Sequence, residues 1–182
     1  MKIQKLEVGM IMTNCYVLDR EDADAALVVD PGGSSDRILD AVKKSGNPLG
    51  AILCTHGHAD HIAGIRFLKE NWPDAEVFIH ERDREMLEDP EKNLSMALGM
   101  PTRALPAEKI FREGPQEIGA YAFEVLHTPG HTQGGVSLYF ASEKAVFSGD
   151  LIFDHSVGRT DLPGSDTDQL LRSIREKVFR LP

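Results

Sequence analysis

Residues 55–61 read Thr-His-Gly-His-Ala-Asp-His, and this short stretch decides how the rest of the sequence is interpreted. It holds four candidate metal ligands: His56, His58, Asp60 and His61. A strand would turn His61 away from the other three, and a helix would turn His58 away from His56 and Asp60. We therefore expect a loop that folds around a central point. Imidazole and carboxylate groups are ligands that zinc, iron and manganese accept, so the stretch predicts a metal site.

The segments on both sides of this loop alternate between strand and helix patterns. Strands are predicted at residues 2–8, 14–19, 25–30, 51–54, 76–80, 121–127, 135–140 and 144–148. Helices are predicted from Ser34 or Ser35 to Gly46, from about 61 to 70, over 81–88, and from about 166 onward. The loop at residues 55–61 follows a buried type of strand and precedes a helix, which is where an α/β protein commonly carries its site.

Residues 89–118 differ from the rest because they contain four prolines. Between the first two of these prolines lie Leu94, Met96, Leu98 and Met100. We interpret this segment as a short helix or a loop packed against the core, with a substrate lid as the alternative.

Two further candidate ligands follow other predicted strands. His131 lies in Thr-Pro-Gly-His-Thr (128–132), and Asp150 lies in Ser-Gly-Asp (148–150). Loops at strand ends are where α/β proteins usually assemble their sites. Together with the four residues of the first loop, they make a set of six.

At these intervals, the HGHADH, TPGHT and SGD motifs resemble the metallo-β-lactamase superfamily. The segment GRTDLPGSD (158–166) resembles the single-domain bacterial glyoxalase II-like hydrolases, although the related persulfide dioxygenases share its first four residues. Val-Asp-Pro-Gly at 29–32 and Asn-Cys-Tyr at 14–16 are similar to the same group. The likeness covers almost the whole chain.

The resemblance implies an α/β fold of the αββα sandwich type. Two mixed β-sheets would pack face to face, with helices on both outer faces, in one domain spanning residues 1–182. It also implies a metal centre at one edge of the sandwich, holding one or two zinc ions, with iron or manganese as alternatives. His56, His58 and His131 would bind the first ion. Asp60 and His61 would bind the second, with Asp150 bridging both.

The sequence departs from the family pattern at its end. The family usually adds a histidine in a PGHG-type turn beyond the last helix, whereas this sequence ends at Leu181-Pro182 and has no histidine after His155. We therefore expect the chain to lack the C-terminal strand and helices of the family. The second metal site should then be weaker than the first.

The function implied by the resemblance is hydrolysis of a thioester of the S-lactoylglutathione type through a metal-bound hydroxide, with a small-molecule thioester as the partner. Asp60 is the candidate catalytic residue, which would orient the hydroxide or accept its proton. One alternative is an iron-dependent persulfide dioxygenase, with iron held by His56, His131 and Asp150. Another is a metal-binding protein without catalysis. No basic cluster suited to the carboxylates of glutathione is evident, so several small thioesters or esters are candidate substrates.

The remaining polar residues are expected to serve the fold. We interpret His80 as structural and His127 as a hydrogen-bonded neighbour of the site and not as a ligand. Asp30 is expected to cap the turn that follows its strand. Asp154 and His155 are expected to lie on a solvated loop, with the lining of the pocket as the alternative. The charges at 81–88 would form a solvated helix face.

Two smaller expectations concern a loop and the cysteines. Arg159 and Asp161 are expected to form an ion pair that fixes the loop behind the metals. Cys15 and Cys54 are not part of a CxxC motif, so we interpret them as small buried hydrophobic residues.

Composition excludes several classes of protein. The chain has 182 residues, 41% of them hydrophobic, which suits one soluble domain with a proper core. Its net charge of −9 argues against a nucleic-acid partner, because a surface that binds phosphates normally carries an excess of positive charge. No apolar stretch approaches the ~20 residues of a membrane span, and the N-terminus has no signal-peptide pattern. We therefore expect a cytoplasmic protein with no membrane partner, and its oligomeric state is left open.

Overall fold

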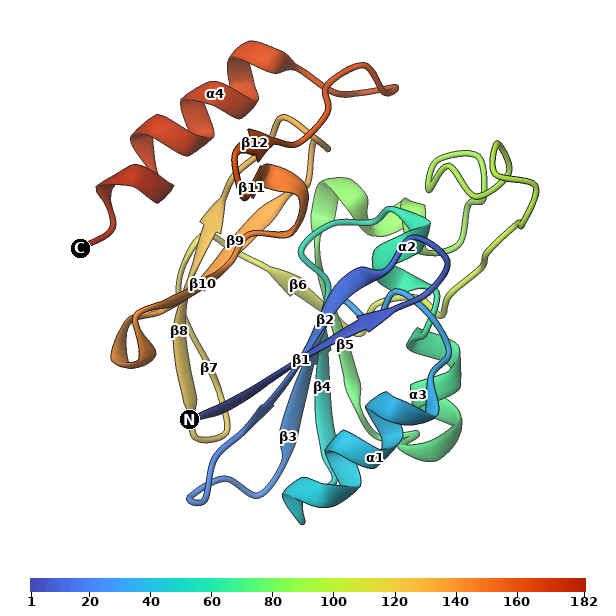
Figure 1. The fold of residues 1–182 in the computed structure, drawn as a ribbon, viewed down its shortest axis with the longest axis vertical. Helices are drawn as coiled ribbons and strands as arrows, with labels where there is room; N and C mark the ends of the chain where they lie inside the picture. Colours follow the sequence, from blue (N-terminus) through green and yellow to red (C-terminus); the bar gives the residue numbers. More distant parts are fainter.

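The computed structural model describes residues 1–182 and contains two β-sheets. The first sheet has six strands, which lie side by side in chain order (Figure 1). They are β1 (Lys2–Val8), β2 (Thr13–Asp19), β3 (Ala26–Val29), β4 (Leu49–Leu53), β5 (Glu76–His80) and β6 (Lys109–Phe111). The pairs β1–β2 and β2–β3 are antiparallel, and β3 to β6 are parallel. This sheet is therefore mixed, as predicted.

The second sheet has four strands in the order β10-β9-β8-β7. They are β7 (Gly114–Ile118), β8 (Tyr121–His127), β9 (Val136–Phe140) and β10 (Ala145–Phe147). All of its pairs are antiparallel, so it is not mixed, because short connections join each strand to the next. A separate hairpin pairs β11 (Ile152–Phe153) with β12 (Ser156–Val157).

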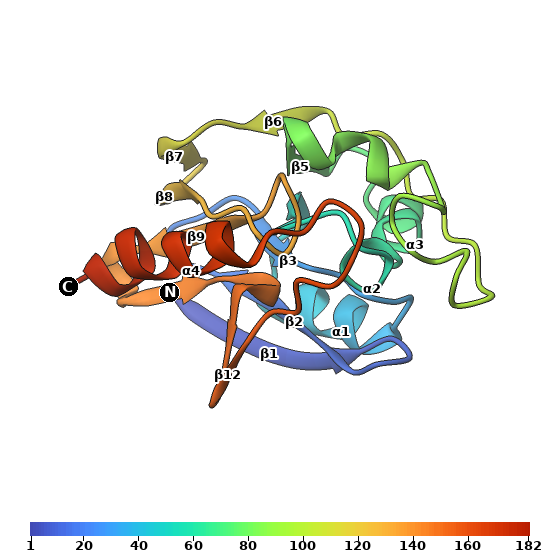
Figure 2. The ribbon, with the colours of Figure 1, turned by 90° about the horizontal axis from the view of Figure 1, so that it is seen from above.

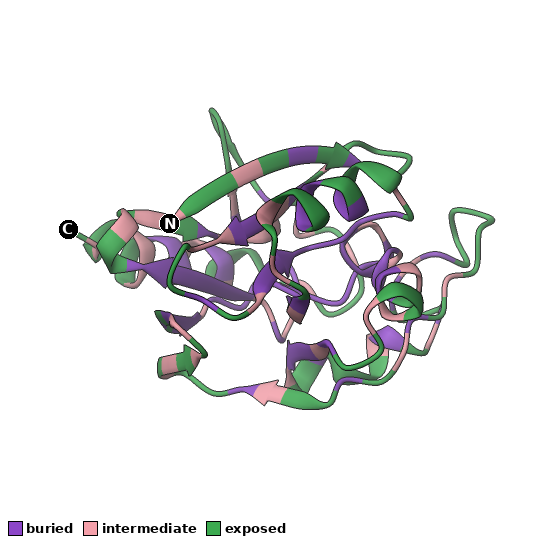
Figure 3. Ribbon diagram, turned by 90° about the horizontal axis from the view of Figure 1, so that it is seen from below, coloured by how far each residue is buried: buried purple, intermediate pink, exposed green.

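The main core lies between the two sheets and is rich in aromatic residues. Phe78 and Phe111 extend from the first sheet to meet Phe123 and Phe140 of the second. The rings of Phe123 and Phe140 stack with centroids 4.9 Å apart. The inner faces of the strands are accordingly buried (Figure 3). Aromatic and branched side chains at alternate positions thus account for the face-to-face packing.

Helices complete the sandwich on its outer sides (Figure 2). On the outer face of the first sheet, α1 (Asp36–Ser45), α2 (Ala59–Ile62) and α3 (Ile65–Asn71) bury a second apolar cluster. At the other side, α4 (Thr167–Glu176) packs on the loop after β8, where Ser173 Oγ donates to the carbonyl of Pro129 over 2.7 Å. Short 3-10 helices span Glu81–Leu87 (η1), Ala141–Glu143 (η2), Gly149–Leu151 (η3) and Val178–Arg180 (η4). The αββα expectation is confirmed.

Most predicted element boundaries agree with the structure to within two residues, but two regions differ. The helix predicted over 61–70 is broken between α2 and α3 at Gly64, whose N–H donates to the carbonyl of Pro31 over 2.7 Å. A Cβ at Gly64 would lie 2.6 Å from the carbonyl oxygen of Gly33 and 2.8 Å from that of Pro31, so glycine is required at this break.

The segment 89–118 also differs from its prediction. It supplies β6 and β7, which the sequence analysis missed, and Pro115 sits on β7, an edge strand that tolerates it. Met96, Leu98 and Met100 are 51%, 56% and 47% exposed, so the interpretation of these residues as core packing was wrong. Ala104 and Ala107 of the same segment do join the core.

The fold brings several strand ends to one place. The loops after β3, β4, β8 and β10 carry Asp30, residues 54–58, residues 128–135 and residues 148–150 respectively. The two sheets are tied together there because the Val136 N–H donates to the carbonyl of Thr55 over 2.8 Å. None of the helices has the length and hydropathy needed to pass through a bilayer.

Candidate metal centre

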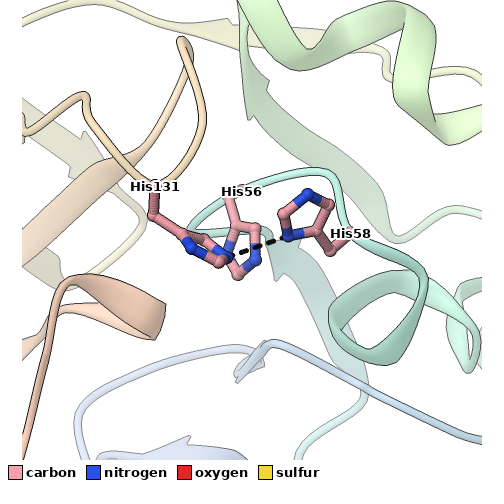
Figure 4. Close-up of side chains that lie close together, drawn as sticks. All are labelled: His56, His58 and His131. Carbon is pink, nitrogen blue, oxygen red and sulfur yellow. Dashed lines mark hydrogen bonds between the residues drawn. The ribbon is translucent and has the colours of Figure 1, made fainter. Parts of the chain in front are cut away.

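Three imidazoles converge where these loops meet. His56 and His58 come from the loop after β4, and His131 comes from the loop after β8 (Figure 4). Each imidazole offers one ring nitrogen, and these three nitrogens all lie within 4.8 Å of one another. The nitrogens His58 Nδ1 and His131 Nε2 are 2.9 Å apart. All three residues are buried. The sequence prediction required this proximity, and these distances allow the three to share one cation.

A second group lies beside the first. Ligand atoms of His56, His61 and Asp150 are also within 4.8 Å of one another. His61 Nε2 is 3.2 Å from Asp150 Oδ1, and His131 Nε2 is 3.6 Å from Asp150 Oδ2. Asp150 therefore faces both groups, which is the bridging position that the resemblance implied. His56 contributes to both groups, and this was not anticipated.

Asp60 lies next to the second group and is not part of the compact set. Its Oδ2 is 3.3 Å from His61 Nε2 and accepts a hydrogen bond from Thr13 Oγ1 over 3.1 Å. Burial opposes ionisation, but the hydrogen bond and charge of His61 outweigh it and lower the pKa of Asp60 to about 2. Asp60 is therefore a carboxylate at neutral pH.

The chemistry of this cluster suits a metal ion. His56 Nε2 is buried without a hydrogen-bond partner, which is costly for a polar atom unless something binds it. Both ring nitrogens of His61 are buried beside the carboxylates of Asp30, Asp60 and Asp150. Burial and the neighbouring imidazole of His131 lower the pKa of His58 to about 4, so its ring is neutral and can offer a lone pair. Imidazoles with adjacent carboxylates are a donor set that zinc, iron and manganese accept.

One backbone contact orients a candidate ligand. His131 Nδ1 donates to the carbonyl of Arg159 over 2.8 Å, which leaves its Nε2 free to face Asp150. The same loop is held by the expected ion pair, in which Arg159 Nε donates to Asp161 Oδ1 over 2.7 Å. The GRTD segment thus serves the site through its backbone, and its charged side chains are exposed.

Asp30 has a different role from the turn cap that we expected. It is buried at the end of β3, where it accepts hydrogen bonds from the N–H and the Oγ1 of Thr55, both over 2.7 Å. Its Oδ2 is 3.0 Å from His61 Nδ1. Asp30 therefore holds the start of the ligand loop and one of the imidazoles. The strand end before Pro31-Gly32 was the only sequence signal for it.

Asp83 was missed because it lies among charges that we interpreted as a solvated helix face. It is only 1% exposed, so that interpretation was wrong for this residue. Its carboxylate accepts from the Gly57 N–H over 3.1 Å, from Thr132 Oγ1 over 2.7 Å and from the Gly134 N–H over 2.7 Å. These donors belong to the two loops that supply His56, His58 and His131. Asp83 therefore joins the two loops.

We expect Asp83→Asn to weaken metal binding by about 10–100-fold, the usual cost of losing a contact behind a ligand. The amide has one acceptor oxygen and would direct an NH₂ group at a donor, which should also cost about 1–3 kcal/mol of unfolding free energy. Metal titration and urea unfolding measure the two effects. Glu88→Gln, on the exposed surface nearby, is the matched control. Equal metal affinity in the two variants would contradict this role.

The other histidines do not join the cluster. His80 and His127 stack on each other with centroids 4.2 Å apart, and His127 Nε2 donates to the carbonyl of Gln133 over 3.0 Å. The side chains of Asp154 and His155 are 92% and 93% exposed, as expected for a solvated loop. Cys15 and Cys54 are buried and unpaired, and burial raises the pKa of both thiols.

Comparison with known proteins gives a consistent result. The family model of the metallo-beta-lactamase superfamily matches residues 8–181. The chain is 39% identical to the probable metallo-hydrolase YqgX of Bacillus subtilis (strain 168), over all of this chain and 86% of that protein. It is 32% identical to the hydroxyacylglutathione hydrolase GloC of Haemophilus influenzae, with the same shares of the two chains covered.

Two solved structures show the same fold. The BLEG-1 B3 metallo-beta-lactamase superposes with a TM-score of 0.94 at 39% identity, covering 100% of this chain and 87% of that one. TTHA1623, solved in a di-iron-bound form, gives a TM-score of 0.84 at 33% identity, covering 98% and 87%.

Proposed function

The chain belongs to the metallo-beta-lactamase superfamily, and from this premise we propose that it is a metal-dependent hydrolase of thioesters, the class of compound that includes S-lactoylglutathione. The observation that carries the proposal is the convergence of His56, His58 and His131 beside His61 and Asp150. The relative named as a hydroxyacylglutathione hydrolase supports the choice of thioesters.

We propose the six residues predicted from the sequence as the metal-binding set. His56, His58 and His131 would hold one ion, and His61 with Asp150 would hold a second, with Asp60 beside it. Zinc is the proposed metal, and iron is the first alternative because a similar structure holds two iron ions. A bound ion of this kind lowers the pKa of water from 15.7 to about 7 and polarises a carbonyl group.

The residues of this chain provide positioning. Asp60 is ionised at neutral pH and is held by Thr13, so its carboxylate can accept a hydrogen bond that orients a water molecule. The thiolate released from a thioester is a good leaving group, so the reaction does not require a strong general acid. We also propose a cytoplasmic location, supported by two buried cysteines that remain unpaired.

The test is elemental analysis of protein purified without added metal, combined with an assay that measures free thiol released from S-lactoylglutathione and from a simple acyl thioester. We expect at least one zinc per chain and thiol release that is lost after chelation. If the protein instead contains a single iron and consumes oxygen in the presence of glutathione persulfide, the proposed hydrolase activity is wrong and the protein is a persulfide dioxygenase. Bound metal without turnover of any thioester would favour a binding protein without catalysis.

A further inference from the structure

The turn between β1 and β2 exposes three consecutive apolar side chains. Met10, Ile11 and Met12 are 68%, 60% and 68% exposed. Isolated exposed apolar residues are common, but a contiguous group on one turn indicates a surface that contacts something. The neighbouring residue Thr13 holds Asp60 of the candidate centre. The apolar turn therefore stands directly beside the proposed metal site.

This turn forms one wall of a cleft of about 620 Å³ that opens at the candidate centre. Ile11 and Met12 line one side, and Ile152 and Phe153 of β11 line another, with Asp60, His61 and Asp150 also in the lining. Phe153 is 44% exposed, so its ring also presents apolar surface to the cleft.

A smaller hollow of about 60 Å³ extends the apolar surface. It shares Ile11 and Asp60 with the main cleft and adds Met10, Leu98 and Met100. Leu98 and Met100 of the 94–100 segment therefore face the β1–β2 turn. This arrangement explains why they do not pack in the core.

Aspartate carboxylates dominate the charge around the cleft. The residues that line the two hollows include no lysine and no arginine, and their ionisable members are His61, Tyr16 and four aspartates: Asp30, Asp60, Asp150 and Asp154. A carboxylate on the distal part of a substrate would find no cationic side chain here, and it would lose hydration without compensation. Glutathione carries two carboxylates, so its distal part does not match this lining.

Resting on the proposed function, we infer that the substrate is a thioester whose thiol arm carries no carboxylate and whose apolar portion packs against Ile11, Met12 and Phe153. Water adds to the thioester carbonyl carbon, the C–S bond breaks, and a carboxylate, a thiol and one proton are released. Glutathione thioesters are then poor substrates of this site. Flexible methionines suit a range of apolar shapes, so the site accepts more than one such arm.

The first measurement compares two substrates with the same acyl group. Butyryl-S-N-acetylcysteamine has an uncharged thiol arm, and butyryl-S-glutathione has the same reactive carbonyl with a charged arm. We expect kcat/KM for the uncharged thioester to exceed that for the glutathione thioester by about tenfold or more. A ratio of this size is what a few gained apolar contacts and a few unpaired polar groups produce. Equal values, or a preference for the glutathione thioester, would overturn the inference.

The second measurement uses matched variants. Met12→Lys places a cation in the cleft and should narrow the preference between the two thioesters by about threefold or more. Met96→Lys adds the same charge at another exposed methionine, 51% exposed and outside both hollows, and should leave the ratio unchanged. If both variants change the ratio equally, the effect is one of overall charge and the proposed contact is wrong.

A binding measurement separates this inference from the proposed function. S-butyl-N-acetylcysteamine and S-butylglutathione are thioethers that water cannot cleave, and calorimetry should show at least tenfold tighter binding of the first. If no thioester is hydrolysed but the uncharged thioether still binds more tightly, the proposed function is wrong and the apolar binding site is supported. Turnover without the preference would overturn the inference alone.

Discussion

His56→Ala is expected to remove metal from both candidate sites and to lower thioester turnover by about 10³-fold or more, since the activation of water depends on the bound ion. The reason is the position of this residue. His56 is the one imidazole common to both ligand groups, and its Nε2 is buried without a hydrogen-bond partner in the protein. Elemental analysis and the thiol-release assay measure the two losses.

His155→Ala is the control for this variant. It removes an imidazole whose side chain is 93% exposed and which belongs to neither ligand group. Its metal content and turnover should equal those of the unmodified chain. A His56→Ala protein that keeps its metal and its turnover would show that any activity arises elsewhere. Circular dichroism and urea unfolding establish that the variant is folded.

The approach of four candidate residues could be predicted because each lies just after a strand that its sequence pattern reveals: His56, His58, His131 and Asp150. Asp60 and His61 follow on the short helix α2, and not in a loop as predicted. The loop at 55–61 follows a run of buried residues, and His131 and Asp150 follow two more. Ends of neighbouring strands meet at one edge of a sheet, so local patterns were sufficient to place residues that are far apart in the chain.

The residues that support the site could not be predicted in the same way. Asp83 joins donors at positions 132 and 134, about fifty residues further along the chain, and nothing in Glu81–Leu87 distinguishes it from its charged neighbours. Asp30 is likewise an ordinary acidic residue until the fold brings Thr55 and His61 to it. A single carboxylate acquires such a role through tertiary contacts, which leave no periodic signal.

The short strands β6 and β7 were missed for a related reason. They have three and five residues, and Pro115 interrupts the second, so neither shows the alternation that predicts a strand. β6 is formed by pairing with β5, and β7 by pairing with β8. The apolar residues of the same segment misled the interpretation because Leu98 and Met100 line the smaller hollow and not the core, and Met96 is exposed.

Gly32→Ala is expected to lower the unfolding free energy by about 2–3 kcal/mol, as overpacking against backbone does, and to weaken metal binding at the second group. A Cβ at this position would lie 1.8 Å from the carbonyl oxygen of Asp60. The backbone that carries Asp60 and His61 would have to move away. The side chain of Thr13, which holds Asp60, is also 3.0 Å from the added carbon and limits the available space.

Gly46→Ala separates this steric effect from the general cost of replacing glycine. Gly46 ends α1 with φ +87° and has nothing within 4 Å of the position of a Cβ, so alanine there should cost about 1 kcal/mol through backbone strain alone. Its metal affinity should be unchanged. Urea unfolding and metal titration of the two variants test the difference.

If Gly32→Ala loses no more stability than Gly46→Ala and binds metal equally well, then the close approach of residues 30–33 to Asp60 does not hold the ligand loop in place. The support for that loop would then have to come from the hydrogen bonds that Asp30 and Asp83 accept from it.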